Sequence, residues 1–264
     1  MLPSPDDTRH RFAPARGLGL MRIAVLSDVH SNLPALEAVL THARSHDGFD
    51  AIWVTGDLVG YGADPNEVLA KLRAHEVAAV AGNHDLAACG KMGVEEFNGS
   101  AATAALWTRE HLSPESRAWL AALPQVRIEA ACTLAHGSIR DPVWEYLLSA
   151  EQALTQFDLQ TTPYGIVGHS HLPFAFEERP DDVPSLRRTP DGACIEAGST
   201  RMVVNPGSVG QPRDGDPRAS YVLYDQAQKT FTWHRVEYDI PAAQAAISGA
   251  GLPSWLAARL AEGR

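Results

Sequence analysis

Residues 22–30 constrain the fold of this chain more than any other stretch of its sequence. They begin with a short apolar, partly β-branched run at 23–26, typical of a buried strand, and Asp28 and His30 follow it. Two residues apart in an extended segment, these side chains project from the same side. A carboxylate and an imidazole at the carboxyl end of a strand are a natural beginning for a metal site. Taken alone, this pair is better explained as a solvated Asp and His in a loop. Only together with the later motifs does it favour a metal site.

Two further strand–helix units repeat the arrangement. A buried strand at 51–54 is followed by Asp57, and a strand at 77–80 is followed by Asn83 and His84. In open α/β sheets, ligands bind beyond the carboxyl ends of the strands. Turn chemistry would explain each polar group alone, since Gly, Asn and Asp favour turns. Repetition at one edge of a sheet favours a binding site.

Histidines follow two of the later predicted strands. A strand at 133–135 precedes His136, and one at 166–167 precedes His169 and His171. The remaining pattern predicts strands at 202–204, 220–224 and 231–236, helices at 98–123 and in the tail from 241, and a loop at the polar, Pro-rich residues 177–192. Strands and helices alternate early and strands predominate later, which predicts a mixed α/β layered domain with one continuous core.

Composition excludes several classes of protein. A net charge of −10 argues against a protein that holds nucleic acid through a broad basic surface, and the sequence carries no strong nucleic-acid signal. Three widely spaced cysteines indicate no disulfide framework and favour a reducing, cytoplasmic setting. No apolar run is long enough for a membrane span. Residues 1–20 hold charges and three prolines, so we expect a disordered extension before a single domain at 21–264. The sequence is compatible with a homo-oligomer.

Eight side chains after predicted strands could carry the chemistry: Asp28, His30, Asp57, Asn83, His84, His136, His169 and His171. Seven of them suit divalent cations through oxygen or imidazole nitrogen. None is a thiolate, which argues against a structural zinc site. Two metals that share one carboxylate would use this many ligands and leave positions for water and substrate. Such a pair activates a bridging water for in-line displacement at phosphorus.

The ordered motifs resemble the calcineurin-like metallophosphoesterases from about residue 21 to at least 224. They are Asp28-Val-His30, Gly56-Asp57, Gly82-Asn83-His84-Asp85, His136-Gly137 and Gly168-His-Ser-His171. The resemblance implies an α/β fold, a four-layer α/β/β/α sandwich of two mixed sheets flanked by helices. It also implies a metal-dependent phosphoesterase with a dinuclear metal centre at one edge.

Matched position by position, the resemblance also implies a role for each site residue. The first metal would be held by Asp28, His30, Asp57 and His171, and the second by Asp57 (as the bridge), Asn83, His136 and His169. His84 would meet the substrate phosphate and protonate the leaving oxygen as general acid, with the metal-bridging hydroxide as nucleophile. Mn²⁺ is the expected metal, with Fe, Ni, Zn, Co and Mg as alternatives.

The motifs depart from the protein Ser/Thr phosphatase branch, which carries Gly-Asp-x-x-Asp-Arg-Gly. Gly60 stands where that branch has the aspartate that orients the catalytic histidine, and Tyr61 replaces its phosphate-clamping arginine. The third motif ends in Asp85 and not in Glu. Asn205-Pro-Gly-Ser208 matches small bacterial and archaeal phosphodiesterases more closely. The segment 136–146 looks like a sub-branch that includes dinucleoside polyphosphate hydrolases.

The substrate contacts have alternatives. Arg140 could replace the missing clamp, since a guanidinium matches phosphate oxygens, or it could be a surface arginine paired with a nearby acid such as Glu145. Trp144 and Tyr146 could stack on a base or pack in the core. Arg213 is a third candidate for substrate binding. Asn205 and Ser208 are expected to shape a turn near the metals.

The leading interpretation is a phosphodiesterase or nucleotide hydrolase, whose substrate could be a dinucleoside polyphosphate. A broad-specificity phosphomonoesterase or protein phosphatase is the enzymatic alternative. The third interpretation is a non-catalytic binding scaffold of the same fold, against which the intact ligand set and His84 argue. Fold alone does not choose among these, because function depends on the site.

Overall fold

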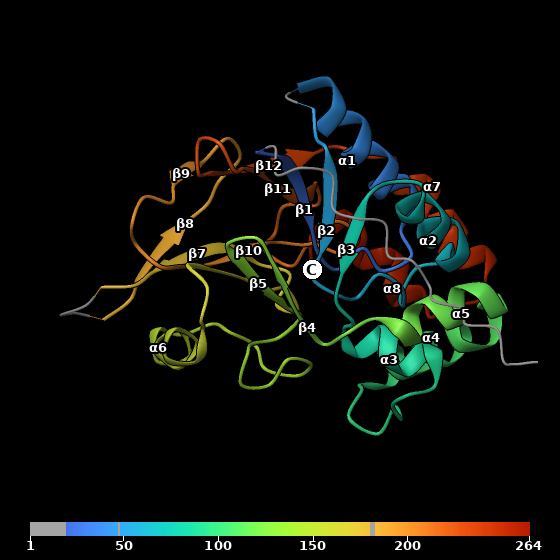
Figure 1. The fold of residues 1–264 in the computed structure, drawn as a ribbon. Coiled ribbons are helices and arrows are strands. Elements are labelled where there is room, and N and C mark those ends of the chain that lie inside the picture. Colours follow the sequence, from blue (N-terminus) through green and yellow to red (C-terminus); the bar gives the residue numbers. More distant parts are fainter. Residues whose placement is uncertain (1–19, 47, 180–182) are drawn as a thin grey trace, which may run out of the picture.

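The structure is a computed structural model that describes residues 20–46, 48–179 and 183–264. The expected extension at 1–20 lies outside the described residues except for Leu20. Within the described ranges the strands form two six-stranded mixed sheets (Figure 1). No helix in these ranges is long and apolar enough to cross a membrane.

The first sheet carries the early strand–helix units. In spatial order it contains β3 (Val77–Ala79), β2 (Ala51–Val54), β1 (Arg22–Leu26), β11 (Ala219–Asp225), β12 (Thr230–Val236) and β9 (Cys194–Glu196). β1, β2 and β3 are parallel, whereas β11 returns antiparallel to β1. The carboxyl ends of the three parallel strands therefore meet at one edge of the sheet.

The second sheet brings the later histidines to the same region. In spatial order it contains β4 (Val126–Glu129), β5 (Cys132–Ala135), β6 (Tyr164–Ile166), β10 (Met202–Pro206), β7 (Pro173–Glu177) and β8 (Ser185–Arg188). β5, β6 and β10 are parallel, and the other pairings are antiparallel.

The helices cover the outer faces of the two sheets (Figure 1). They are α1 (Leu33–His46), α2 (Pro65–Arg73), α3 (Asn83–Cys89), α4 (Gly99–His111), α5 (Pro114–Ala122), α6 (Ala150–Leu159), α7 (Ile240–Gly249) and α8 (Ser254–Ala258), followed by the 3₁₀ turn Arg259–Glu262. α1 and α2 lie on the first sheet and α6 lies on the second. The described chain is thus the α/β/β/α sandwich that the motifs predict.

Alternation along β1 shows how the layers are held together. Ala24 and Leu26 pack under α1 and α2, whereas Ile23 and Val25 face the other way, into the core between the two sheets. All four side chains are buried. A strand buried on both faces reads as a continuous apolar run, which is why this segment is recognisable from sequence.

The predicted loop at 177–192 is wrong in part. Glu177 ends β7, and residues 185–188 form β8, whose Phe174↔Arg188 to Glu177↔Ser185 register makes it the outer strand of the second sheet. Leu186 is 54% exposed, and Arg187 and Arg188 are exposed as well. An edge strand that faces solvent lacks the apolar alternation by which strands are recognised.

Candidate metal centre

The polar residues predicted from the strand ends lie together where the two sheets meet. Asp28 and His30 follow β1, Asp57 follows β2, His136 follows β5, and His169 and His171 follow β6. Backbone hydrogen bonds join these ends: the N–H of Asp28 donates to the carbonyl of Gly56 (3.1 Å), and that of Gly168 donates to the carbonyl of His136 (2.8 Å). The second of these bonds joins the turns after β5 and β6, within the second sheet.

Five of the predicted metal ligands adopt left-handed backbone conformations, with φ between 49° and 64°: Asp28, His30, Asp57, His169 and His171. Such conformations cost a residue with a side chain about 1–2 kcal/mol each. They persist where the surrounding packing determines them, and they cluster at functional sites. The turns therefore hold these side chains at a local energetic cost.

Three overlapping groups of side chains bring potential metal-ligating atoms within 4.8 Å of one another. They are Asp28, His30 and His171; His30, Asp57 and His84; and Asp57, His136 and His169. Asp57 and His30 each belong to two groups. Asp57 Oδ2 lies 3.3 Å from His136 Nε2 and 3.7 Å from His30 Nε2, so one carboxylate oxygen faces imidazoles from two groups.

Backbone carbonyls orient three of the imidazoles. His30, His136 and His171 each donate from Nδ1, to the carbonyls of Val59 (3.2 Å), Thr55 (2.8 Å) and Gln211 (2.5 Å). Each Nε2 is then the ring nitrogen that faces the centre, and in the neutral imidazole it carries the lone pair. This tautomer, with the outer nitrogen on a carbonyl, is the one found in metal-ligating histidines.

Several buried polar atoms in the centre have no hydrogen-bond partner. Among the described residues they include Asp28 Oδ1, Asn83 Oδ1 and His169 Nε2. His30 Nε2 and His171 Nε2 lie only 3.2 Å apart, a separation at which two lone pairs repel unless a proton or a cation lies between them. Unpaired buried acceptors are costly. Divalent cations would satisfy them, so the donor set fits metal ions.

The pKa shifts of the site residues agree with a site that binds positive charge. Burial raises the pKa of Asp28 to about 7. Burial would also raise the pKa of Asp57, but the imidazoles of His136 and His84 hold it well below its usual range. Burial alone would lower the pKa of His136, and the Asp57 carboxylate instead raises it to about 9. In the bare chain a protonated imidazole thus neutralises Asp57, and metal binding displaces such protons.

His84 lies in the first turn of α3 and belongs to one of these groups, with His30 and Asp57. Its backbone N–H donates to Asp57 Oδ1 (2.9 Å), and its ring lies 4.4 Å from that of Tyr61 and 4.9 Å from that of Phe97. Its Nδ1 is buried without a hydrogen-bond partner. Asp85 does not supply one, because its carboxylate accepts from the backbone N–H groups of Val59 (3.1 Å) and Gly82 (3.0 Å).

Gly60 leaves the space that the His84 ring occupies. A Cβ at this position would lie 2.4 Å from His84 Nδ1, and the residue has φ +93°. The departure from the phosphatase motif at Gly60 and the position of the His84 ring are therefore one structural feature.

Gly60→Ala should lower the free energy of unfolding by about 1–3 kcal/mol and displace His84, with a loss of activity. Gly90→Ala is the matched control, since Gly90 has φ +86° and nothing within 4 Å of its Cβ position. It should cost similar backbone strain without loss of activity. Urea unfolding and turnover measure the two effects, and equal activity in both variants would contradict the assignment of this contact.

The predicted substrate contacts lie in different surroundings. Arg140 is exposed and forms an ion pair with Glu145, the surface alternative that the sequence left open. Trp144 packs partly on a buried cluster and lies edge-on to Phe97, at 5.3 Å between ring centroids. Tyr146 is 44% exposed and stacks on His169 at 4.0 Å.

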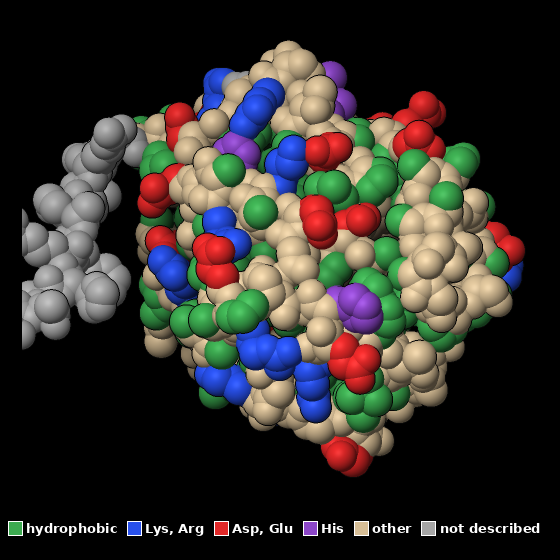
Figure 2. Space-filling view, turned by 90° about the vertical axis from the view of Figure 1, so that its right-hand side faces the viewer, with side chains coloured by type: hydrophobic (Ala, Val, Ile, Leu, Met, Phe, Trp, Pro, Cys, Tyr) green, Lys and Arg blue, Asp and Glu red, His purple; other side chains and the backbone are tan. Residues whose placement is uncertain are grey.

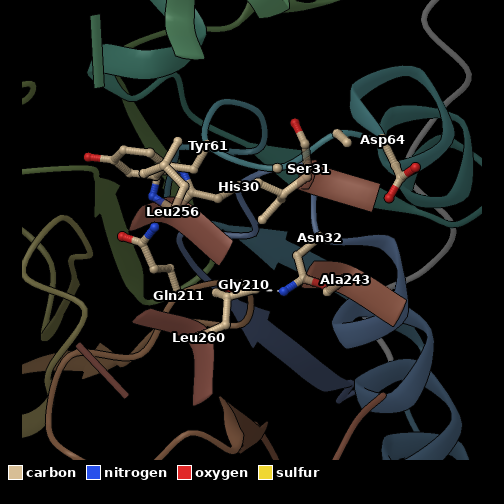
Figure 3. A pocket seen from close by; sticks show the side chains of 13 residues that line it. His30, Ser31, Asn32, Tyr61, Asp64, Gly210, Gln211, Ala243, Leu256 and Leu260 are labelled. Carbon is tan, nitrogen blue, oxygen red and sulfur yellow. Dashed lines mark hydrogen bonds between the residues drawn. The ribbon is translucent and has the colours of Figure 1, made fainter. Parts of the chain in front are cut away.

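Arg213 lies on Tyr61, close to the centre, with its guanidinium carbon 5.9 Å from the ring centroid. As expected, Asn205 and Ser208 hold turns beside the site: Asn205 Nδ2 donates to the carbonyl of Gly168 and Ser208 Oγ to that of Asp28, both at 2.8 Å. Figure 3 shows Tyr61, His30 and Gln211 at one side of a pocket and Ala243 of α7 at the other, and Leu256 of α8 also lines it.

Phe97 and Gln211 contact site residues, and sequence reasoning missed both. Phe97 belongs to the segment between α3 and α4 and touches His84, and Gln211 orients His171. Neither stands in a motif that marks chemistry. Figure 2, a view of one face, shows Lys and Arg side chains interspersed with those of Asp and Glu.

Residues 21–229 match the calcineurin-like phosphoesterase superfamily domain. A metallophosphoesterase from Sphaerobacter thermophilus is similar in structure, with a TM-score of 0.84 and 42% identity over 93% of this chain and all of that one (100%). An uncharacterized protein of Methanocaldococcus jannaschii is 38% identical over 249 residues, 92% of this chain and 98% of that protein. A symmetrical bis(5'-nucleosyl)-tetraphosphatase of Pectobacterium atrosepticum is 40% identical over 68 residues, 25% of this chain and 24% of that enzyme. The chain belongs to the calcineurin-like phosphoesterase superfamily.

Proposed function

We propose that this chain is a phosphoesterase that depends on two divalent metal ions and hydrolyses a nucleotide-type phosphodiester or polyphosphate. The observation that carries the proposal is the position of Asp57, which belongs to two of the three donor groups. Its Oδ2 faces His136 on one side and His30 on the other. One carboxylate is thereby available to two ions, the arrangement that a dinuclear site requires.

The resemblance to the family implies the remaining ligands: Asp28, His30, Asp57 and His171 would hold one ion, and Asp57, Asn83, His136 and His169 the other. The donor groups include all of these except Asn83, whose Oδ1 is buried without a hydrogen-bond partner. When bound, the ions supply Lewis-acid charge at phosphorus and lower the pKa of a water molecule. Mn²⁺ suits this mixture of oxygen and imidazole ligands, as do Fe, Ni, Zn, Co and Mg to different degrees.

The chain itself contributes orientation and a proton donor. Carbonyls of Val59, Thr55 and Gln211 fix three imidazoles before any ion arrives, so little reorganisation is needed on binding. His84 is held by its backbone and by the rings around it, at the side of the centre. There it is placed to pass a proton to the leaving-group oxygen, the role of a general acid, although burial lowers its pKa to about 4 and the bound phosphate would have to raise it.

Aromatic side chains around the centre support a nucleotide as substrate. Ring contacts lead from His84 through Phe97 and Trp144 to His169. Tyr146 stacks on His169 and is exposed enough to meet a ligand. Exposed rings stack on bases of any sequence. The partial similarity to a bis(5'-nucleosyl)-tetraphosphatase points to the same substrate class. A cytoplasmic setting and the oligomeric state remain predictions.

The test is a parallel assay of the purified protein with Mn²⁺ on four substrates: an activated phosphodiester, an activated phosphomonoester, a cyclic nucleotide and a dinucleoside tetraphosphate. We expect turnover of the diester or the tetraphosphate to exceed that of the monoester. Preference for the monoester would support the phosphomonoesterase alternative and contradict the proposal. No turnover of any substrate by protein with a full metal complement would indicate a binding scaffold.

Removal of the metal should lower activity and stability together. Elemental analysis of the active protein should find two ions per chain. Chelation should abolish turnover, and added Mn²⁺ should restore it. Since ions bind the folded chain only, each site adds about 2.7 kcal/mol of unfolding free energy when free metal is 100 times its Kd. Turnover that survives complete removal of the ions would contradict metal dependence.

A further inference from the structure

Arg213 is a guanidinium beside the centre that pairs with no carboxylate among the residues that the structure describes. Its Nη2 donates to Gln211 Oε1 (3.0 Å) and lies 3.5 Å from the hydroxyl of Tyr61. Its Nε is buried and has no hydrogen-bond partner. The nearby Arg218 and Arg235, by contrast, both form ion pairs with aspartates. A partly buried guanidinium with unused donors is available to an anion.

Arg213 brings a positive charge beside the predicted metal ligands through its contacts with Gln211 and Tyr61. A substrate phosphate bound at these ligands would add negative charge there.

The segment that carries Arg213 is fixed to the predicted ligands. The Ser208 hydroxyl and the Gly210 N–H both donate to the carbonyl of Asp28, at 2.8 and 2.9 Å. Gln211 accepts from His171 with its backbone carbonyl and from Arg213 with its side chain. The position of the guanidinium is therefore determined by the same contacts that determine those of Asp28 and His171.

Tyr61 supports Arg213 from the other side. Its ring lies 4.6 Å from that of His30 and 4.4 Å from that of His84, and the guanidinium lies over it. Figure 3 shows the Tyr61 ring beside His30 and Gln211. A guanidinium on an aromatic face keeps its planar fork and its outward N–H groups. Tyr61, which stands where the phosphatase motif has an arginine, thus packs against an arginine from a distant part of the chain.

We propose that Arg213 binds the substrate phosphate at this centre and that Tyr61 is its positioning residue. The inference rests on the proposed function, since it assigns a role in the same site. In this assignment the arginine that binds phosphate stands at position 213, whereas the phosphatase motif has it at the position of Tyr61. Arg140, the other candidate, is already engaged by Glu145 and needs no anion.

The test is a calorimetric titration of the Mn²⁺-loaded protein with inorganic phosphate. Arg213→Ala and Arg213→Gln should each weaken phosphate binding about 10- to 100-fold, the size of one or two hydrogen bonds to a charged group. Metal content and melting temperature should not change. Arg213→Lys should retain part of the affinity, because it keeps the charge and loses the fork. KM should rise more than kcat falls on any substrate that is turned over.

Arg187→Ala is the matched control. It removes a half-exposed arginine that pairs with Glu177 on the edge of the second sheet, and it should leave phosphate binding unchanged. Wild-type affinity in Arg213→Ala would overturn the proposal, and so would a wild-type protein that binds metal without binding phosphate. A protein that binds phosphate through Arg213 yet hydrolyses no substrate would overturn the proposed function alone.

A double-mutant cycle tests the positioning role. Tyr61→Phe keeps the ring and should bind phosphate nearly as wild type does, since the hydroxyl contact is long. Tyr61→Ala should weaken binding, but in the Arg213→Ala background it should add nothing further. An equal additional loss in that background would show that Tyr61 acts independently of Arg213 and would overturn its positioning role.

Discussion

Asp57→Asn should empty the metal centre and abolish turnover while the fold survives. The carboxylate is shared between two donor groups, so its loss leaves both short of a ligand and removes charge between them. Mutation of a residue that only hydrogen-bonds to a metal ligand lowers metal affinity or activity about 10- to 100-fold. Mutation of a ligand shared by two ions should therefore lower activity at least about 100-fold. Asparagine keeps the oxygen that accepts from the His84 N–H, which is why the backbone should stay in place.

Elemental analysis and turnover decide the outcome, with Asp158→Asn as control. Asp158 is an exposed residue of α6, and its replacement removes the same charge far from the donor groups. Full metal occupancy with retained activity in Asp57→Asn would contradict the bridging assignment. A cooperative unfolding transition in the variant is required, because a collapsed fold would lose metal for other reasons.

The centre could be predicted closely because its residues stand in local motifs. Asp28, Asp57 and His136 each follow a short buried strand, and parallel strands end at one edge. The sequence therefore showed which residues meet, although not how they are oriented. Asp85 illustrates the difference: adjacent to His84 in sequence, it points away and holds the backbone of Val59 and Gly82.

Contacts made only by tertiary packing could not be predicted. Tyr61 and Arg213 are 152 residues apart and meet because the segment after β10 is hydrogen-bonded to the end of β1. Phe97 reaches His84 from a loop that has no recognisable pattern. These tertiary contacts depend on how distant segments of the chain pack against each other. A local sequence motif carries no information about that packing.

The strands and helices that sequence reasoning missed have physical reasons of their own. β4, β8 and β9 are short strands at the sheet edges, and exposed side chains on them hide the alternation. α6 did carry a recognisable signal, a capping box formed by Ser149 and Gln152 at its first turn.

His84→Ala should reduce turnover of a substrate with a poor leaving group by about 10²- to 10⁴-fold, the usual contribution of a positioned general acid. An alkoxide needs a proton as the ester bond breaks, and His84 lies next to Asp57 with its Nδ1 buried and unpartnered. A nitrophenolate hardly needs one. On a nitrophenyl ester the loss should therefore be much smaller, and both substrates must be measured with the same variant.

The structure also gives His84 a second possible role, because it forms a donor group with His30 and Asp57. Metal content separates the two roles. A general acid can be removed while both ions stay bound, whereas removal of a ligand lowers occupancy and harms both substrates alike. Equal losses on the two esters with full metal content would instead mean that His84 binds phosphate. Proton donation by His84 predicts that only the turnover of the ester with the poor leaving group falls, while metal occupancy is unchanged. Protonation of the leaving group is the step that depends on the basicity of the departing oxygen.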